Sequence, residues 1–184
     1  MNEAQDIEAI ARGDHIAFER IATRYLPIIL RYAQRILDNS SAAEDIAQET
    51  LIVLWLKAEQ FNPAKSQLTT WLHTIAHNKC TDYWRAQQRV MTLSESKSKS
   101  EDSHNDHLEV SAPADSEVDG QYIRKWLQSL PPRQRHALVL TYYQSLSNKE
   151  VGEVMGLGVR AVESLLVRAR TAMKERLGED YDRS

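Results

Sequence analysis

The stretch from Ser145 to Leu177 most constrains the fold, because helix-forming segments alternate there with glycines at set positions. Ser147 and Glu150 have the spacing of a capping box, which predicts a helix that begins at Asn148. Gly156 predicts the end of this helix, since glycine adopts the left-handed C-cap conformation at low cost. Gly158 is a suitable N-cap for a second helix. A short helix, a glycine turn and a longer helix form the pattern of a helix-turn-helix.

The second helix of this pattern has an apolar stripe at three- and four-residue steps, made of Val162, Leu165, Leu166, Ala169 and Met173. In a helix-turn-helix the N-terminal residues of the second helix lie at the base edges in the DNA major groove. The candidates here are Arg160, Glu163 and Ser164, with Arg168 further along and Lys149 on the first helix. Spacing alone leaves an ordinary helical hairpin as the alternative.

Composition favours an all-α chain, because glycine and proline are few (6 and 5 of 184 residues) and helix-forming residues are abundant. A single cysteine, Cys80, excludes an internal disulfide framework and fits a reducing compartment. No run of eighteen apolar residues predicts a membrane span, and the N-terminus lacks the signature of a secretory signal. We therefore expect a cytoplasmic protein that is not inserted in a membrane.

The formal net charge of −3 is unevenly distributed along the chain. Residues 61–90 and 121–184 carry net charges of +3 and +4, whereas residues 1–60 and 91–120 carry −4 and −6. Local charge matters more than the total for nucleic-acid binding, so the two basic segments are compatible with DNA.

The first sixty residues predict two helices. Asp14 begins the first, which runs to Asp38 and which Pro27 should kink or split. Ser41 and Glu44 form a second capping box and open the next helix. One side of that helix carries a polar set with one apolar member, namely Asp45, Gln48, Glu49 and Ile52. Such a set is either a solvated helix face or a docking face for a basic partner.

Residues 61–67 predict a loop broken by Pro63, and the helix that follows, 68–85, mixes aromatic and basic residues. Single-stranded nucleic acid requires both kinds of side chain, because unstacked bases need an aromatic surface and phosphates need cations. For Trp71 a position in the core is the preferred reading.

Residues 91–118 are rich in serine and acidic residues and lack hydrophobic periodicity, which predicts a flexible acidic linker. Helices resume with Ile123, Trp126, Leu127 and Leu130 as apolar positions; Pro131 and Pro132 end the first, and 133–143 forms the next. The predicted fold is all-α, with helical domains at residues 9–90 and 119–178, the second containing the helix-turn-helix.

With these segments placed, the chain resembles an extracytoplasmic-function (ECF) sigma factor of bacterial RNA polymerase. The resemblance covers roughly residues 13–177 outside the linker, and its motifs occur in the right order. Residues 43–49 with Trp55 resemble the helix that binds core polymerase. The run from Trp71 to Arg85 resembles the promoter-melting helix, and residues 130–135 with the helix-turn-helix resemble the second DNA-binding domain.

The resemblance implies a non-enzymatic subunit, without cofactor or metal, that binds core RNA polymerase and promoter DNA and is held inactive by an anti-sigma factor. Asp45, Gln48, Glu49 and Ile52 would face the polymerase. The minus-ten contacts would come from Phe61, Asn62, Lys65, Ser66, Trp71, Asn78, Asp82, Arg85 and Arg89. The minus-thirty-five contacts would come from Lys149, Arg160, Glu163, Ser164 and Arg168.

Three positions depart from the family pattern. The family often has a basic residue where Glu163 stands, arginine where Leu165 stands and alanine where Gly152 stands. Glu163 cannot hold a phosphate, but it can accept a hydrogen bond from a cytosine amino group. We therefore expect either the minus-thirty-five sequence that this chain reads or the strength of that contact to differ from the family pattern.

Two other functions fit parts of the sequence. His73, His77 and Cys80 share a helix face and are possible zinc ligands, but no fourth ligand is evident and structural zinc normally has four. A stand-alone transcriptional regulator would explain the helix-turn-helix. It would not explain an aromatic and basic helix beside an acidic docking helix.

Overall fold

The computed structural model describes residues 3–95 and 117–181, and every regular element in these ranges is a helix. The first domain comprises α1 (Glu3–Ala11), α2 (His15–Ile36), α3 (Ser40–Lys57), the 3₁₀ turn η1 (Ala58–Gln60) and α4 (Leu68–Glu95). The second comprises α5 (Glu117–Ser129), α6 (Pro132–Leu138), the π-helical turn η2 (Val139–Tyr143), α7 (Asn148–Met155) and α8 (Val159–Tyr181). The prediction of an all-α chain is confirmed.

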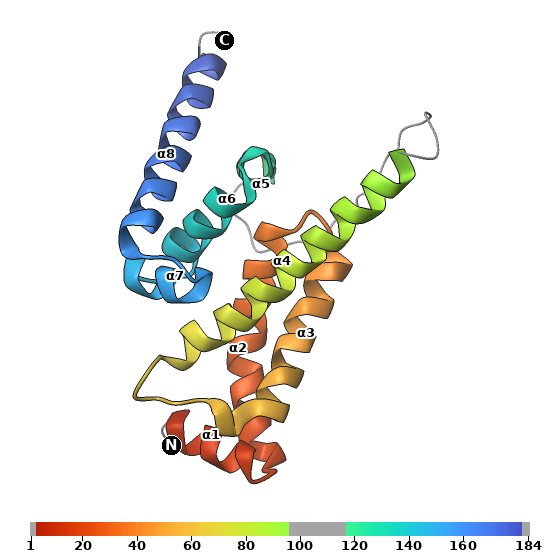
Figure 1. The fold of residues 1–184 in the computed structure, drawn as a ribbon, viewed down its shortest axis with the longest axis vertical. Helices are drawn as coiled ribbons and strands as arrows, with labels where there is room; N and C mark the ends of the chain where they lie inside the picture. Colours follow the sequence, from red (N-terminus) through yellow and green to blue (C-terminus); the bar gives the residue numbers. More distant parts are fainter. Residues whose placement is uncertain (1–2, 96–116, 182–184) are drawn as a thin grey trace.

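In the first domain, α2, α3 and α4 pack around a shared apolar core (Figure 1). Asp14 caps α2 as expected, because its side chain accepts hydrogen bonds from the backbone N–H groups of Ile16 and Ala17 at 2.8 and 3.1 Å. The residues of this core with no exposed area include Ile29, Tyr32, Ile36, Leu54 and Leu72. Burial of these apolar side chains stabilises the helices more than the intrinsic helix propensity of their residues does.

Pro27 does not split α2, which continues from His15 to Ile36. The proline side chain is exposed, so the carbonyl group that loses its hydrogen-bond donor can be hydrated. Ile29 and Tyr32, two and five residues further on, are fully buried. Their packing holds the helix together across the proline.

The cap of α3 is Asn39 and not Ser41. The Asn39 side chain accepts a hydrogen bond from the Ala42 N–H group at 2.9 Å, and the helix begins at Ser40. Asn39 is an equally good N-cap by residue type and lies two residues earlier, so the predicted capping box of Ser41 and Glu44 was wrong.

The helix-turn-helix has the predicted local geometry. The Ser147 N–H group donates to Glu150 at 2.8 Å while the Ser147 hydroxyl accepts from the Glu150 N–H group, which completes the capping box. Gly156 ends α7 with a φ of 64°, in the left-handed region, and α8 begins directly after Gly158. At Gly152 a Cβ atom would lie 2.6 Å from the carbonyl oxygen of Leu157, so this turn is built closely against the glycine.

Several details of the second domain differ from the predictions. The helix expected over 133–143 changes to a π-helical turn at Val139, and Tyr143 is 38% exposed. Ile123 and Met173 are also exposed, and Leu165 is only half-buried. The apolar stripe of α8 is therefore narrower than expected and consists of Val162, Leu166 and Ala169.

The ends of the predicted linker, 91–118, lie within helices, because α4 continues to Glu95 and α5 begins at Glu117. The remainder of that prediction, residues 96–116, lies outside the described residues. The two domains contact each other, since α7 packs against α4 and α2 contacts α5, α6 and η2 (Figure 1). Among the described residues, none of the helices combines the length and the apolar character needed to cross a membrane.

Candidate polymerase and nucleic-acid interfaces

The outward side of α3 carries the polar set predicted to face the polymerase. Asp45, Gln48, Glu49 and Ile52 are exposed, whereas Ile46, Ala47, Thr50, Leu51 and Leu54 on the opposite side are buried. Ile52 is 54% exposed and Leu56, one turn later, is 68% exposed. An acidic helix face with exposed apolar side chains is suited to a protein partner.

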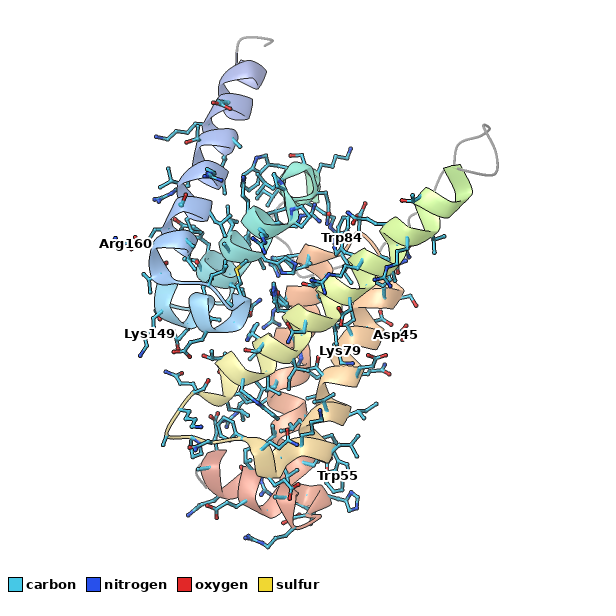
Figure 2. All side chains as sticks on the ribbon, viewed as in Figure 1. Asp45, Trp55, Lys79, Trp84, Lys149 and Arg160 are labelled. Carbon is cyan, nitrogen blue, oxygen red and sulfur yellow. The ribbon has the colours of Figure 1, made fainter. Side chains whose placement is uncertain are left out.

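Glu49 has a partner within this chain, because the Lys79 ammonium group on α4 lies 2.5 Å from its carboxylate. Figure 2 shows Asp45 and Lys79 on the same side of the first domain, away from Lys149 and Arg160. Asp45, Gln48 and Glu49 all face solvent, and among them Glu49 also forms an ion pair within the chain.

The loop before α4 is organised by one asparagine. The Asn62 side chain accepts a hydrogen bond from the Ala64 N–H group at 2.9 Å, and the Asn62 carbonyl accepts from Lys65 N–H at 3.0 Å. Asn62 and Lys65 are exposed and Ser66 is half-buried. The Phe61 and Trp71 rings contact each other, with their centroids 5.6 Å apart. Both side chains are partly buried against the core of the first domain.

The predicted strand-binding residues of α4 form one exposed line. Asn78, Asp82, Arg85 and Arg89 recur at three- and four-residue steps, and all four are exposed. Asp82 and Arg85 form an ion pair at 3.3 Å with 74% and 67% of their side chains exposed. An exposed pair of this kind contributes little to stability, so both groups can exchange partners for nucleic acid.

The helix-turn-helix presents a second exposed line on α8. Arg160, Glu163, Ser164 and Arg168 all face solvent, as does Lys149 on α7. Figure 2 shows Lys149 and Arg160 projecting from the side of the second domain that lies away from α3. The five predicted minus-thirty-five residues are therefore accessible to a duplex.

A cluster between the domains was missed by the sequence analysis. The Tyr32 hydroxyl on α2 lies 2.7 Å from His136 Nδ1 on α6, and His77 Nδ1 on α4 lies 3.1 Å from the same nitrogen. Tyr32 and His136 are buried, with 0% and 3% of their areas exposed. No local pattern reveals this cluster, because its members are 45 to 104 residues apart in the chain.

Arg135 is the second feature that sequence reasoning missed. Its guanidinium group is buried and donates to the backbone carbonyls of Ile36, Gln128 and Leu130 at 2.7, 2.6 and 3.2 Å, and also to the Gln128 side chain. Burial lowers the pKa of this arginine to about 10, so it stays charged at neutral pH. It joins the end of α2 to the α5–α6 turn.

Burial keeps the histidines of the interdomain cluster neutral. It lowers the pKa of His77 to about 4, with a further contribution from the positive charge of Arg133. The pKa of His136 is also well below its ordinary value, because of burial and the neighbouring His77 and Arg135. The Tyr32 hydroxyl has its pKa raised by burial and stays protonated.

The three possible zinc ligands considered above do not converge. His73 Nδ1 lies 2.8 Å from the carbonyl oxygen of Thr69, and His77 faces Tyr32 and His136. Cys80 is buried, and burial raises the pKa of its thiol to about 12. Within the described ranges, no three His, Cys, Asp or Glu side chains gather as a metal site would require.

Comparison with protein families gives two matches that cover both domains. Residues 21–90 match Sigma-70 region 2, and residues 120–173 match Sigma-70, region 4. The chain is 32% identical over 166 residues to the ECF RNA polymerase sigma factor SigF of Caulobacter vibrioides, covering 90% of this chain and 88% of that relative. It is 29% identical over 178 residues to SigW of Bacillus subtilis, covering 93% and 94% of the two chains.

Solved structures show the same fold. The sigma factor RpoE of Bartonella quintana, in complex with the anti-sigma factor NepR, superposes with a TM-score of 0.74 and 25% identity, covering 88% of this chain and 96% of that one. CnrH in complex with the cytosolic domain of CnrY gives a TM-score of 0.72 at 22% identity, covering 97% and 98%.

Proposed function

The chain belongs to the ECF sigma factors of bacterial RNA polymerase, and we propose that three separate exposed faces divide the work of this subunit. As a sigma subunit it binds core RNA polymerase, directs it to specific promoters and helps to melt the DNA. In our proposal the first domain, residues 9–90, binds polymerase and the minus-ten element. The second, residues 119–178, reads the minus-thirty-five element.

The α3 face is proposed to dock on core polymerase. Asp45 and Gln48 supply polar contacts, and Ile52 supplies an apolar contact. Glu49 is proposed to contact polymerase while its carboxylate stays paired with Lys79. This ion pair also joins α3 to α4. This face is separated from the DNA-binding line of α8, which lets one chain hold polymerase and promoter together (Figure 2).

The exposed line of α4 and the loop before it are proposed to hold the melted non-template strand. Flipping a base out of the duplex costs a few kcal/mol in stacking and pairing, and a pocket that captures one particular base offsets that cost. The loop supplies Phe61, Asn62, Lys65 and Ser66 beside Trp71. The helix supplies Asn78, Asp82, Arg85 and Arg89 for the bases and phosphates that follow.

The α8 line is proposed to read the minus-thirty-five duplex. Arg160 can donate two hydrogen bonds to a guanine, and Glu163 can accept one from a cytosine amino group. Ser164 is proposed to lie at the base edges beside Glu163, and the exposed Lys149 and Arg168 are proposed to position the helix on the phosphate backbone. Tethering two weak DNA sites in one chain raises the effective concentration of the second once the first is bound.

We further propose an anti-sigma factor as a regulatory partner. Two solved structures with this fold are complexes of a sigma factor with such an inhibitor, NepR in one case and CnrY in the other. The exposed apolar groups Ile52 and Leu56 on α3 and Val167 on α8 are suited to a protein that covers these faces. The chain itself is proposed to act in the cytoplasm without catalysis, because polymerase makes the phosphodiester bonds.

The observation that carries this proposal is an acidic and apolar patch on α3 that stays exposed. The core of the first domain does not bury it. Asp45→Arg should weaken binding to core polymerase in a competition assay against a labelled sigma subunit, because it reverses charge on the docking face. Glu8→Arg, an equal charge reversal on an exposed residue of α1, is the matched control. Equal affinity of the two variants would count against this face.

Binding to promoter fragments, measured with and without core polymerase, separates a sigma subunit from a stand-alone regulator. A sigma subunit should bind promoter fragments tightly only when core polymerase is present. Tight and sequence-specific binding by the chain alone, with no change on adding polymerase, would support the regulator instead.

A further inference from the structure

A cleft with a volume of about 520 Å³ lies between α4 of the first domain and the α6 and α7 region of the second. Pockets that bind small molecules have volumes of about 300–1,000 Å³. Neither DNA-binding line needs such a hollow, because a single strand follows an open groove over several nucleotides and a duplex is read by an exposed helix. The cleft is therefore a candidate site for a small ligand.

The two walls of the cleft differ in chemical character. On α4 the wall is mainly polar and includes Asn78, Thr81 and Arg85. On the second domain Met155 and Leu157, which are half-buried, supply apolar surface. Small-molecule sites combine apolar surface, which supplies contact area, with a few polar groups that fix the orientation of the ligand.

The charged groups that line the cleft leave one positive charge without a partner. Asp82 and Arg85 pair with each other at 3.3 Å, and among the described residues Arg133 on α6 forms no ion pair. The charge of Arg133 reaches across the cleft to α4, since it adds to burial in lowering the pKa of His77 to about 4. Because His136 also has a pKa well below its ordinary value, both histidines are neutral. The lining is therefore suited to a ligand with a single negative charge.

Trp84 supplies an unused hydrogen-bond donor at the same place. Its ring lines the cleft, and its indole nitrogen is buried without a hydrogen-bond partner among the described residues. A buried donor without a partner is unfavourable, so an acceptor oxygen that reaches it from the cleft would be stabilised.

We propose that this cleft binds a small organic monoanion with an apolar body, of which an aromatic carboxylate is the simplest example. The Arg133 guanidinium group would pair with the carboxylate, because planar guanidinium and carboxylate groups form two parallel hydrogen bonds. Met155 and Leu157 would pack against the apolar body. A phosphate monoester fits the lining less well, because it carries close to two negative charges at neutral pH.

A ligand in this cleft would lie against Asn78, Asp82 and Arg85, the residues proposed above to hold the melted strand. The ligand and the strand would therefore compete for these side chains. This consequence rests on the proposed strand-binding role of α4, whereas binding of the ligand to the free chain does not.

Nuclear magnetic resonance of the nitrogen-15-labelled full-length chain tests the site with 2-naphthoate, a monoanion with two fused apolar rings. The indole N–H signal of Trp84, assigned with the variant Trp84→Phe, reports binding. Trp55, Trp71 and Trp126 do not line the cleft, so their signals are internal controls. We expect 2-naphthoate to shift the Trp84 signal saturably, with a dissociation constant of roughly 1 mM or below for a probe of this size, and to leave the other three signals in place.

Three variants separate the charge from the apolar wall. Arg133→Met should weaken binding of 2-naphthoate about tenfold and leave binding of the uncharged 2-naphthamide unchanged, because only the charge-assisted contact is lost. Binding of 2-naphthamide also shows that the cleft is still formed in this variant. Leu157→Ala should weaken both probes, since it removes apolar contact. Arg12→Met, the same change at an exposed arginine between α1 and α2, is the matched control and should weaken neither.

Three results would overturn the proposal. The first is a Trp84 signal that does not move with 2-naphthoate, and the second is an equal shift of all four indole signals. The third is an Arg133→Met variant that binds 2-naphthoate as tightly as the unmodified chain does. Because no DNA is present in this experiment, these results would leave the strand-binding role of α4 to its own tests.

Discussion

Replacing Arg135 by methionine tests whether a single buried guanidinium group joins three helices. In the structure this group donates to three backbone carbonyls, those of Ile36, Gln128 and Leu130, and to the Gln128 side chain. Methionine fills a similar volume but donates no hydrogen bond. The change therefore leaves these four acceptors without their hydrogen-bond donor. The site is buried, because Arg135 is only 2% exposed.

The expected loss in the free energy of unfolding follows from those four acceptors. Each lost hydrogen bond costs about 1 kcal/mol net, so the sum is about 4 kcal/mol. Methionine also removes the cost of burying a charge, which offsets part of the loss. We expect a net decrease in the free energy of unfolding of about 2–3 kcal/mol, or a fall in Tm of roughly 10–20 °C for a domain of this size.

Urea denaturation followed by circular dichroism and tryptophan fluorescence measures this decrease. Arg133→Met is the matched control, because Arg133 lies two residues earlier on α6 and is exposed. The control should change the free energy of unfolding by less than about 0.5 kcal/mol. A loss for Arg135→Met no larger than that of the control would refute the assignment of Arg135 as a structural tie.

Three further predictions concern DNA reading, the helix turn and pH. Arg160→Ala should weaken promoter use through the minus-thirty-five element by about 1–3 kcal/mol if it contacts a base, and run-off assays that show equal loss on every minus-thirty-five variant would indicate a phosphate contact instead. Gly152→Ala should lower stability by about 1–2 kcal/mol, because displacing the Leu157 carbonyl outweighs the gain in helix propensity, and a more stable variant in thermal denaturation would contradict this. Burial and Arg133 lower the pKa of His77 to about 4 in the folded chain, so the unfolded chain binds this proton more tightly. The contribution of His77 to the free energy of unfolding should be constant above about pH 6.5 and should fall toward pH 4, by at most about 3 kcal/mol. A free energy of unfolding that stays constant over that range would contradict this prediction.

Features that depend on a few neighbouring residues could be predicted from the sequence. The capping box of Ser147 and Glu150 and the left-handed Gly156 place α7 to the residue, because both are local hydrogen-bond and backbone effects. The residues exposed along one side of α3, α4 and α8 could also be predicted, because side chains on one face of a helix recur with a period of 3.6 residues. These signals also carried the resemblance to the family.

The remaining features depend on contacts between distant residues. The Tyr32–His136 contact spans 104 residues and the Arg135–Ile36 contact spans 99, so no window of sequence contains both partners. Packing of Ile29 and Tyr32 outweighs the helix-breaking tendency of Pro27. For α3, two good caps competed within three residues, and residue type alone does not decide between Asn39 and Ser41.

Run-off transcription with purified bacterial core polymerase on a pool of promoter fragments, with and without this chain, tests most directly whether the chain acts as a sigma subunit. We predict discrete start sites that depend on the chain, preceded by shared minus-ten and minus-thirty-five sequences. Asp45→Arg should reduce every start, whereas Arg160→Ala should reduce starts according to their minus-thirty-five sequence. Absence of chain-dependent starts, although the chain alone binds some duplex tightly, would contradict the assignment as a sigma subunit.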